Sequence, residues 1–437
     1  MNRSQVEITQ TGVLIILSCS LLLLMGLASI YVTNTHYAEF DDGPRNAVKQ
    51  LVRILLGLAI GLILLRVGYF NLGRFSYVLF FLVLLLLVPL FVARLTHNEF
   101  GGLFPQRNGA YRWINLPGFP LQPSELMKVT FVLALAWYLR YRDNYRRFSG
   151  LLVPIVASSV PLGLILLEPD LGTCLLLVIV LGTMLFMAGA RIKHLAIIGL
   201  VGLLMVPIAW QNIKGYQRLR VTALLLQSSE LREAIRENPS RYAAIASRKE
   251  AIEWASSSGY QLVHSKNAIG SGRLTGYGWG NGMYCNNPLL PDRHNDFIFA
   301  LIAHQWGLFG AMLVLLCYGM ITLCGILIAS STHEPFARLL AVGITSLIFA
   351  QVTINIGMTL GLMPITGMTL PFVSYGGSGL LTNFISIALL ISVSRHRPFL
   401  LADRPFDFSH RRSHSPYVVE PGERAVTTRS FPHSRAG

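Results

Sequence analysis

Long runs of apolar residues alternate with short polar connections along this chain, and this pattern predicts its fold. A helix that crosses a bilayer needs roughly 20 predominantly apolar residues. Ten runs fit or approach this pattern: Gly12–Val32, Leu51–Val67, Tyr77–Leu95, Val129–Leu139, Leu151–Leu167, Leu171–Ala188, His194–Trp210, Phe297–Ala329, Leu339–Leu360 and Leu370–Val393. We therefore predict an all-α, polytopic membrane protein with about ten transmembrane helices.

The polar connections divide the chain into one membrane domain, residues 1–400, and a tail, residues 401–437. Residues 211–295 form a large extracytoplasmic loop between spans seven and eight. Within it, Gln227–Ser256 has an amphipathic helical pattern with a break at Pro239, which is typical of a helix on the membrane surface. Ser257–Gly282 is dense in glycine, which suits a loop folded over a ligand. The tail is basic, has little to bury and is predicted to be disordered.

Composition and charge support this interpretation. The 437 residues are 53% hydrophobic and 13% charged, whereas soluble domains have about 25% charged residues. The net charge of +15 is concentrated in three places: Arg140–Arg147, Arg191–Lys193 and the chain after Arg395. With both termini in the cytoplasm, ten spans place all three on the cytoplasmic side, as the positive-inside rule expects. The basic excess therefore indicates a multi-pass protein of the cytoplasmic membrane rather than a nucleic-acid-binding protein.

Ionisable residues near membrane depth are costly and therefore mark functional sites. Four groups lie at the predicted outer ends of the spans. In the first, Glu125 and Lys128 lie three apart on one helix face and can pair, either as a structural ion pair or as the lining of a polar cavity. Trp113 can act as an interfacial anchor or as a platform for a sugar ring. The second group, Glu168–Gly172, is predicted to be a turn in which Asp170 caps the next helix.

The third group contains two carboxylates, Asp292 and Asp296, which share one face if the segment is helical. Desolvation by Phe297 and its apolar neighbours would raise the pKa of Asp296. Three nearby cations would lower it: Arg293, Lys266 and Arg273. A carboxylate tuned in this way suits a general base, or a ligand for a hard divalent cation.

The fourth group interrupts an apolar run with the residues Ser374–Ser378. Broken helices are tolerated inside membranes only where they line a cavity or are buried in protein. The backbone N–H groups of Gly376 and Gly377 at a helix start can hold an anion. The alternative is a kink that serves helix packing.

Five stretches in these regions resemble one known family. They are "NGAYRWINLPGFPLQPSELMK", "EPDLGT", "SKNAIGSGRLTGYGWGNG", "LPDRHNDFIFA" and "GLMPITGMTLPFVSYGGSGLLTN". Their order and spacing over nearly the whole membrane region resemble the SEDS (shape, elongation, division and sporulation) family, to which RodA and FtsW belong. The lysine in "HSKNAIGSG" is more similar to RodA than to FtsW.

The resemblance implies a peptidoglycan glycosyltransferase that polymerises lipid II into β-1,4 glycan strands on the outer face of the membrane, for elongation or division. It implies lipid II and an undecaprenyl-pyrophosphate-linked glycan as substrates and a class B penicillin-binding protein transpeptidase as partner. Asp296 matches the family's essential aspartate, Glu125 and Lys128 match its glutamate and lysine, and Trp113 matches the tryptophan of its "RWI". The chain departs from the family at His304 and Gln305, where the family usually has a Glu-Glu pair, and its stretch 227–256 is longer than usual.

The implied transfer inverts the donor sugar once, so it needs a base and a group that neutralises pyrophosphate. Asp296 is the candidate base, or alternatively the ligand of a divalent cation such as Mg or Mn; no organic cofactor is expected. The candidate substrate-binding residues are Trp113, Glu125, Lys128, Lys266, Arg273, Ser374, Gly376 and Gly377. Two other functions remain open: a lipid II flippase or transporter, and a non-catalytic scaffold for wall synthesis.

Overall fold

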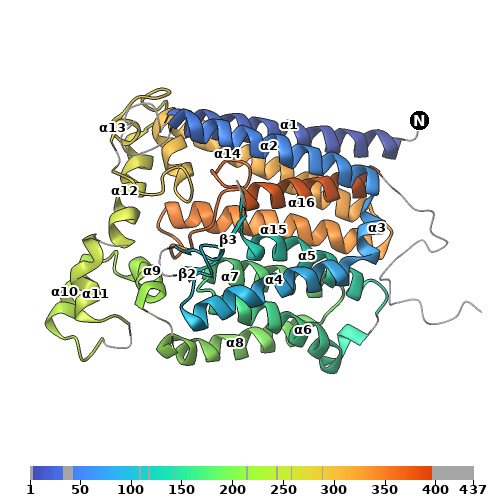
Figure 1. The fold of residues 1–437 in the computed structure, drawn as a ribbon, viewed down its shortest axis with the longest axis horizontal. Coiled ribbons are helices and arrows are strands. Elements are labelled where there is room, and N and C mark those ends of the chain that lie inside the picture. The colour runs from blue at the N-terminus through green and yellow to red at the C-terminus, as the bar shows by residue number, and fades with distance from the viewer. Residues whose placement is uncertain are drawn as a thin grey trace, which may run out of the picture.

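The computed structural model describes residues 3–32, 43–107, 110–116, 119–142, 144–212, 215–242, 245–256, 258–287 and 289–395. Long helices run side by side along a bundle (Figure 1). They are α1 (Arg3–Val32), α2 (Gly43–Val67), α4 (Ser76–Thr96), α5 (Pro123–Leu139), α6 (Phe148–Leu167), α7 (Leu171–Met187), α8 (Ile192–Asn212), α14 (Ile298–Ser331), α15 (Pro335–Thr359) and α16 (Ser378–Arg395). The predicted tail, residues 401–437, lies outside the described residues.

Short elements connect these helices. Near the other end of the bundle from the large loop lie α3 (Tyr69–Arg74) and the 3-10 turn η1 (Asn144–Arg146). Two antiparallel hairpins precede α5: β1 (Gln106–Arg107) with β2 (Ala110–Tyr111), and β3 (Ile114–Leu116) with β4 (Phe119–Leu121). In the second hairpin, Ile114 lies opposite Leu121.

The predicted all-α membrane architecture is confirmed. Among the described residues, seven helices are long and apolar enough to cross a bilayer: α1, α2, α4, α6, α14, α15 and α16. The predicted spans in α7 and α8 correspond to shorter apolar stretches, and the seventeen-residue α5 carries the Glu125–Lys128 pair. The count of ten spans therefore stays a prediction.

Helix α15 forms the centre of the bundle. The protein buries 89% of its apolar window, against 17% for α2 at the periphery. It packs against α5, α7, α14 and α16. Small residues permit this packing: a Cβ added to Gly325 of α14 would lie 2.2 Å from the Thr345 hydroxyl of α15, and small residues are typical where membrane helices approach closely.

The predicted run Leu370–Val393 is helical only from Ser378. Residues 360–377 instead enter the bundle as irregular backbone. Pro371 contributes to this, because proline lacks the N–H that a helix interior requires. The predicted interruption of this run at Ser374–Ser378 is confirmed, and the helical part of the run begins at Ser378.

The large loop folds into several helices at one end of the bundle (Figure 1). They are α9 (Gly215–Leu225), α10 (Ser229–Glu237), α11 (Arg248–Glu253), the turn η2 (Trp254–Ser256), α12 (Ser258–Ser271) and α13 (Met283–Asn286). The predicted break near Pro239 separates α10 from α11. A position on the membrane surface stays a prediction. The prediction that Ser257–Gly282 is a loop throughout was wrong, because its first half is α12.

The glycines that follow α12 pack against a kink in α14. The kink is at Gly307 (φ 61°, ψ −155°). There the N–H of Tyr277 donates to the carbonyl of His304 at 3.1 Å, and the N–H of Gly278 donates to that of Gln305 at 2.9 Å. Gly276 has φ +76°, and a Cβ there would lie 2.2 Å from the Gln305 carbonyl oxygen. These glycines therefore permit close backbone approach, and a ligand beneath this loop stays a prediction.

We expect Gly276→Ala to destabilise the protein more than Gly278→Ala. Both positions have positive φ, which costs an L-residue about 1–2 kcal/mol. At Gly278 the added methyl group meets its nearest atom at 3.5 Å, an ordinary contact. At Gly276 it clashes with backbone, and overpacking adds about 1–3 kcal/mol. The unfolding temperatures of the two variants in the same detergent measure the difference. An equal fall in unfolding temperature would contradict the close backbone contact at Gly276.

Candidate active site

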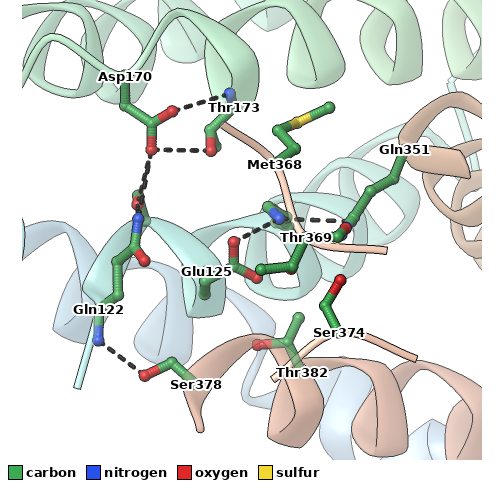
Figure 2. Close-up of polar contacts among 12 residues, drawn as sticks. Gln122, Glu125, Asp170, Thr173, Gln351, Met368, Thr369, Ser374, Ser378 and Thr382 are labelled. Atoms are coloured by element: carbon green, nitrogen blue, oxygen red, sulfur yellow. Dashed lines mark hydrogen bonds and ion pairs between the residues drawn. The ribbon is translucent and has the colours of Figure 1, made fainter. Parts of the chain in front are cut away.

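A polar cavity of about 350 Å³ collects residues from all four polar groups of the sequence. It lies between the irregular segment 360–377, the second hairpin and the starts of α5 and α7, and Figure 2 shows part of its wall. Its lining comprises Arg53, Arg112, Trp113, Pro120, Gln122, Glu125, Asp170, Thr173, Asn295, Asp296, Gly367, Met368, Thr369, Tyr375, Gly376, Gly377, Ser378 and Gly379. Asp296 and Glu125 therefore share one hollow.

Asp296 is carried by a turn that directly precedes α14. This turn is not helical, since Asp292 has φ +51° and α14 begins at Ile298. The condition under which the two carboxylates would share a helix face is therefore not met. The turn is instead held by its backbone: the Ser374 hydroxyl donates to the Asn295 carbonyl at 2.6 Å, and the Asn355 amide donates to the Asp296 carbonyl at 3.0 Å.

The pKa of the half-buried Asp296 carboxyl is set by opposing effects. Desolvation and the charge of Asp292 raise the pKa of Asp296 to about 6, and Asp170 adds to this. The cations Arg220 and Arg112 oppose the shift. The predicted rise of the pKa by desolvation is confirmed, but Arg220 and Arg112 lower it in place of the three cations expected from the sequence. At neutral pH the group is ionised and still basic enough to accept a proton.

Arg293 does not act on Asp296, because its guanidinium is used elsewhere. It is buried, and one of its nitrogens donates to the carbonyls of Tyr284, Cys285 and Asn287 at 3.0, 3.2 and 2.9 Å. Arg293 therefore stabilises the loop around α13 by binding its backbone carbonyls.

The predicted Glu125–Lys128 pair forms at the start of α5. The Lys128 Nζ lies 2.6 Å from a Glu125 oxygen and 3.4 Å from Oε1 of Gln351. Glu125 lines the cavity, whereas Lys128 is only 1% exposed and lies behind it. The pair is thus both a structural ion pair and, through Glu125 alone, part of the cavity wall.

Asp170 caps α7 as predicted and also ties α7 to α5. Its carboxylate accepts from the N–H and hydroxyl of Thr173 at 3.2 and 3.0 Å. It also accepts from the Ser124 hydroxyl at 3.3 Å and from the Gln122 amide at 3.4 Å (Figure 2). Next to it, burial and the charge of Asp170 raise the pKa of Glu168 well above its ordinary value.

Three arginines at or beside the cavity were not assigned to the site from the sequence. Arg112 donates to the carbonyls of Glu168 (2.8 Å) and Pro169. Arg53 of α2 stacks over the Tyr375 ring at 4.5 Å. Arg220 of α9 donates to the Thr366 carbonyl at 3.2 Å. Arg53 had a signal that could have found it, because a charge inside a predicted span is a functional hypothesis by default.

Gly367 lies next to both Arg220 and Asp296. A Cβ added to this glycine would lie 2.8 Å from a guanidinium nitrogen of Arg220 and 3.3 Å from an Asp296 carboxylate oxygen. The absence of a side chain at this position therefore leaves room for both groups.

The remaining predicted site residues fall into two sets. Trp113, Gly376 and Gly377 line the cavity, and Ser374 lies behind it. Lys266 and Arg273 are exposed outside it. The Lys266 Nζ donates to Gln227 Oε1 at 3.2 Å. The structure therefore does not bring these two cations to Asp296.

His304 and Gln305, where the chain departs from the SEDS pattern, also lie outside the cavity. His304 is buried, its Nδ1 lies 2.7 Å from the Ser271 hydroxyl, and its ring packs on Tyr277. Gln305 donates to the sulfur of Cys285 at 3.3 Å. Both side chains join α14 to the loop helices.

The cavity offers a single arrangement for a metal ion. Within the described ranges, no three His, Cys, Asp or Glu residues are grouped closely enough to hold a metal by themselves. Asp296 could supply one carboxylate ligand, with further oxygen ligands from a bound phosphate, as is common for Mg²⁺; the other two carboxylates of the lining are already engaged, Glu125 with Lys128 and Asp170 with Thr173.

Residues 12–398 match the family model of FtsW, RodA and SpoVE, described as cell cycle protein. Stage V sporulation protein E of Bacillus subtilis is 33% identical over 396 residues, which cover 89% of this chain and 98% of that protein. The probable peptidoglycan glycosyltransferase FtsW of Geobacter sulfurreducens is 31% identical over 392 residues, with 89% and 96% covered. A chain from a peptidoglycan synthase complex that coordinates polymerization and crosslinking has a similar structure, with TM-score 0.66, 26% identity and 87% and 96% covered.

We expect Asp292→Asn to shift the titration of Asp296 to lower pH. Asparagine tolerates the positive φ of this position, so the change removes mainly a like charge. Without that charge the pKa of Asp296 falls below about 6, and the carboxylate stays ionised in more acidic solution. Infrared difference spectroscopy of the protonated carboxyl band, assigned through its loss in Asp296→Asn, measures this midpoint. A midpoint that stays put or rises would refute the proposed charge coupling.

Proposed function

The chain belongs to the family of FtsW, RodA and SpoVE, and we propose that it polymerises lipid II with Asp296 as the general base. It is a multi-pass membrane protein and a peptidoglycan glycosyltransferase, the activity for which its FtsW relatives are named. The observation that carries the proposal is the half-buried Asp296 in a polar cavity that it shares with Glu125 and arginine side chains.

The reaction inverts one centre, so it is written as a single displacement. The Asp296 carboxylate takes the proton of the acceptor sugar hydroxyl while that oxygen attacks the anomeric carbon of the donor. The bond between this carbon and the pyrophosphate oxygen breaks, and the pyrophosphate leaves with the electron pair. A carboxyl with a pKa of about 6 is suited to this step, because a base works best when its pKa lies near the operating pH.

Arg53 and Arg112 are placed to neutralise the leaving pyrophosphate. Their planar guanidinium groups match phosphate geometry better than an ammonium group does. Arg112 is held by two carbonyls and Arg53 by the Tyr375 ring, so both are partly ordered before substrate binds. In the alternative role of Asp296, as a metal ligand instead of the base, its carboxylate would hold a divalent cation that supplies positive charge to the leaving group.

The charge pattern supports a membrane topology for the protein, and the family supports a partner protein. We propose the cytoplasmic membrane with both termini inside, because the basic connections 140–147 and 191–193 then face the cytoplasm. We propose a crosslinking partner of the class B penicillin-binding protein type, supported by the similar chain in a complex that coordinates polymerization and crosslinking. Lipid-linked substrates reach the cavity by lateral diffusion.

We expect Asp296→Asn to reduce glycan synthesis by about 10²–10⁴-fold, because this is the contribution of general base catalysis. The assay supplies purified protein, with its partner, with labelled lipid II and resolves the polymer by length. Asp292→Asn, which changes an exposed carboxylate of the same turn, is the matched control: it leaves Asp296 ionised at pH 7.5 and loses far less activity than Asp296→Asn. Full activity of Asp296→Asn would exclude the assignment. Translocation of lipid II in vesicles without polymer would favour a transporter.

We expect Arg53→Gln to lower kcat/KM for lipid II by roughly 10–100-fold, since hydrogen bonds to charged groups contribute about 1.5–3 kcal/mol. Arg53→Lys recovers part of the loss, because lysine restores the positive charge but has neither the planar guanidinium group that binds phosphate with two hydrogen bonds nor its stacking on the Tyr375 ring. Lys49→Gln removes an exposed cation one turn away on α2 and serves as the control. Equal effects at the two positions would mean that only the net charge of the helix matters.

A further inference from the structure

We propose that Asn355 of α15 is a positioning residue for the transfer reaction, because its amide holds the turn that carries Asp296 in register with the opposite cavity wall. The inference rests on the function proposed above and names how the base is held. Asn355 is 0% exposed and does not belong to the cavity lining. Any effect it has on catalysis must therefore pass through another residue.

The geometry of the Asn355 amide supports a bridging role. Its Nδ2 donates to the main-chain carbonyl of Asp296 at 3.0 Å and to that of Met368 at 2.6 Å. An amide NH₂ group has two hydrogens, so one side chain can serve both. Both partners are carbonyl oxygens, so only the nitrogen can face them. Asn355 thus joins the turn before α14 to the irregular segment that forms the other wall.

Gln351, one helical turn earlier, repeats this arrangement on the same face of α15. Its Nε2 donates to the Thr369 carbonyl at 2.8 Å (Figure 2). Its Oε1 accepts from Lys128, which in turn binds Glu125. Because residues 368 and 369 are neighbours, two amides link the Glu125–Lys128 pair to the backbone of Asp296. The base and the ion pair are therefore set relative to each other by α15.

The free oxygen of Asn355 shows what this position requires. Oδ1 is buried and has no hydrogen-bond partner within the described part of the chain. A buried acceptor without a partner carries a free-energy penalty, whereas leucine would fill a similar volume without it. The donor group is therefore what distinguishes asparagine here from an apolar residue of similar size.

Asn355→Leu removes both donors and leaves the cavity lining unchanged. A misplacement of about 1 Å at a reacting group can cost 10²-fold in rate, so we expect kcat to fall by roughly 10–100-fold. KM for lipid II stays within about twofold of wild type, because Asn355 contacts no surface that substrate touches. A residue with a merely structural role would instead lower the amount of folded protein without changing kcat per folded molecule.

The pH profile of kcat gives a second readout. Desolvation keeps the pKa of Asp296 high, so a loosened turn that admits water moves the acid limb to lower pH. The other charged groups that act on Asp296 are Asp292, Arg220, Arg112 and Asp170, and Asn355→Leu replaces none of them. Infrared titration of Asp296 detects the same shift without any turnover, so it tests the positioning role even if lipid II is not the substrate.

Asn355→Asp tests the hydrogen-bond donors of Asn355 separately from the size of its side chain, because aspartate has nearly the same shape. Ionised, it presents oxygen to two carbonyls; protonated, it regains one O–H donor. We therefore expect the ratio of its kcat to that of wild type to rise as pH falls. A ratio independent of pH would indicate packing alone and overturn the proposal. This variant also serves as the test if Asn355→Leu does not fold.

Thr345→Val is the matched control on α15. It removes a buried hydroxyl that has no partner among the described residues and lies outside the cavity, and it keeps the kcat and pH profile of wild type. If wild type polymerises lipid II and Asp296→Asn does not, the proposed function holds. An Asn355→Leu variant with wild-type kcat and an unshifted Asp296 titration would then overturn this inference alone.

Discussion

Backbone N–H and C=O groups that leave a helix inside a membrane protein need new partners, because no water is present in the bilayer core to supply them. Residues 360–377 impose this demand where they lie as irregular backbone between α15 and α16. Side chains of neighbouring helices meet it: Gln351 and Asn355 bind carbonyls of the segment, and Tyr318 of α14 binds the Pro371 carbonyl at 2.5 Å. Because the same segment forms one wall of the cavity, satisfying its backbone also builds the site.

The cavity lining places two arginines, Arg53 and Arg112, among three carboxylates, Glu125, Asp170 and Asp296. Burial makes Asp296 a stronger base, while Arg112 and Arg220 keep it ionised near neutral pH. Glu125 is neutralised by Lys128, so it adds little negative charge to the hollow. Arg53 and Arg112 are then placed to meet an anionic leaving group. A base and an anion-binding surface can coexist here because Arg112 is anchored on backbone carbonyls and Arg53 on an aromatic ring.

Local patterns in the sequence predicted the helices and the polar groups well. Apolar length alone indicated the long helices, the spacing of Glu125 and Lys128 indicated their ion pair, and the Pro-Asp turn indicated the cap at Asp170. Topology then placed the four groups at one end of the bundle. Hydropathy could not reveal the irregular backbone before α16, because leucine, valine and phenylalanine keep that stretch apolar whether or not it is helical.

Contacts between distant segments carry what the sequence could not predict. Arg53 reaches the cavity because α2 lies beside Tyr375, whose hydroxyl donates to Asn46 at 3.2 Å. Arg220 arrives from α9, and no local spacing relates it to Asp296. The same applies to Asn355, which looks like an ordinary polar residue in an apolar helix until its two carbonyl partners are seen.

The replacement of the family's usual acidic pair by His304 and Gln305 raised the alternative of a non-catalytic scaffold. Both side chains face the loop helices and are occupied there, His304 with Ser271 and Gln305 with Cys285. They contribute nothing to the cavity lining. The two substitutions therefore affect how the outer loop packs on α14. Asp296 and the groups that shift its pKa are not part of these contacts. The departure from the family therefore bears on the loop and its contacts, and it gives no reason to doubt the chemistry of the cavity.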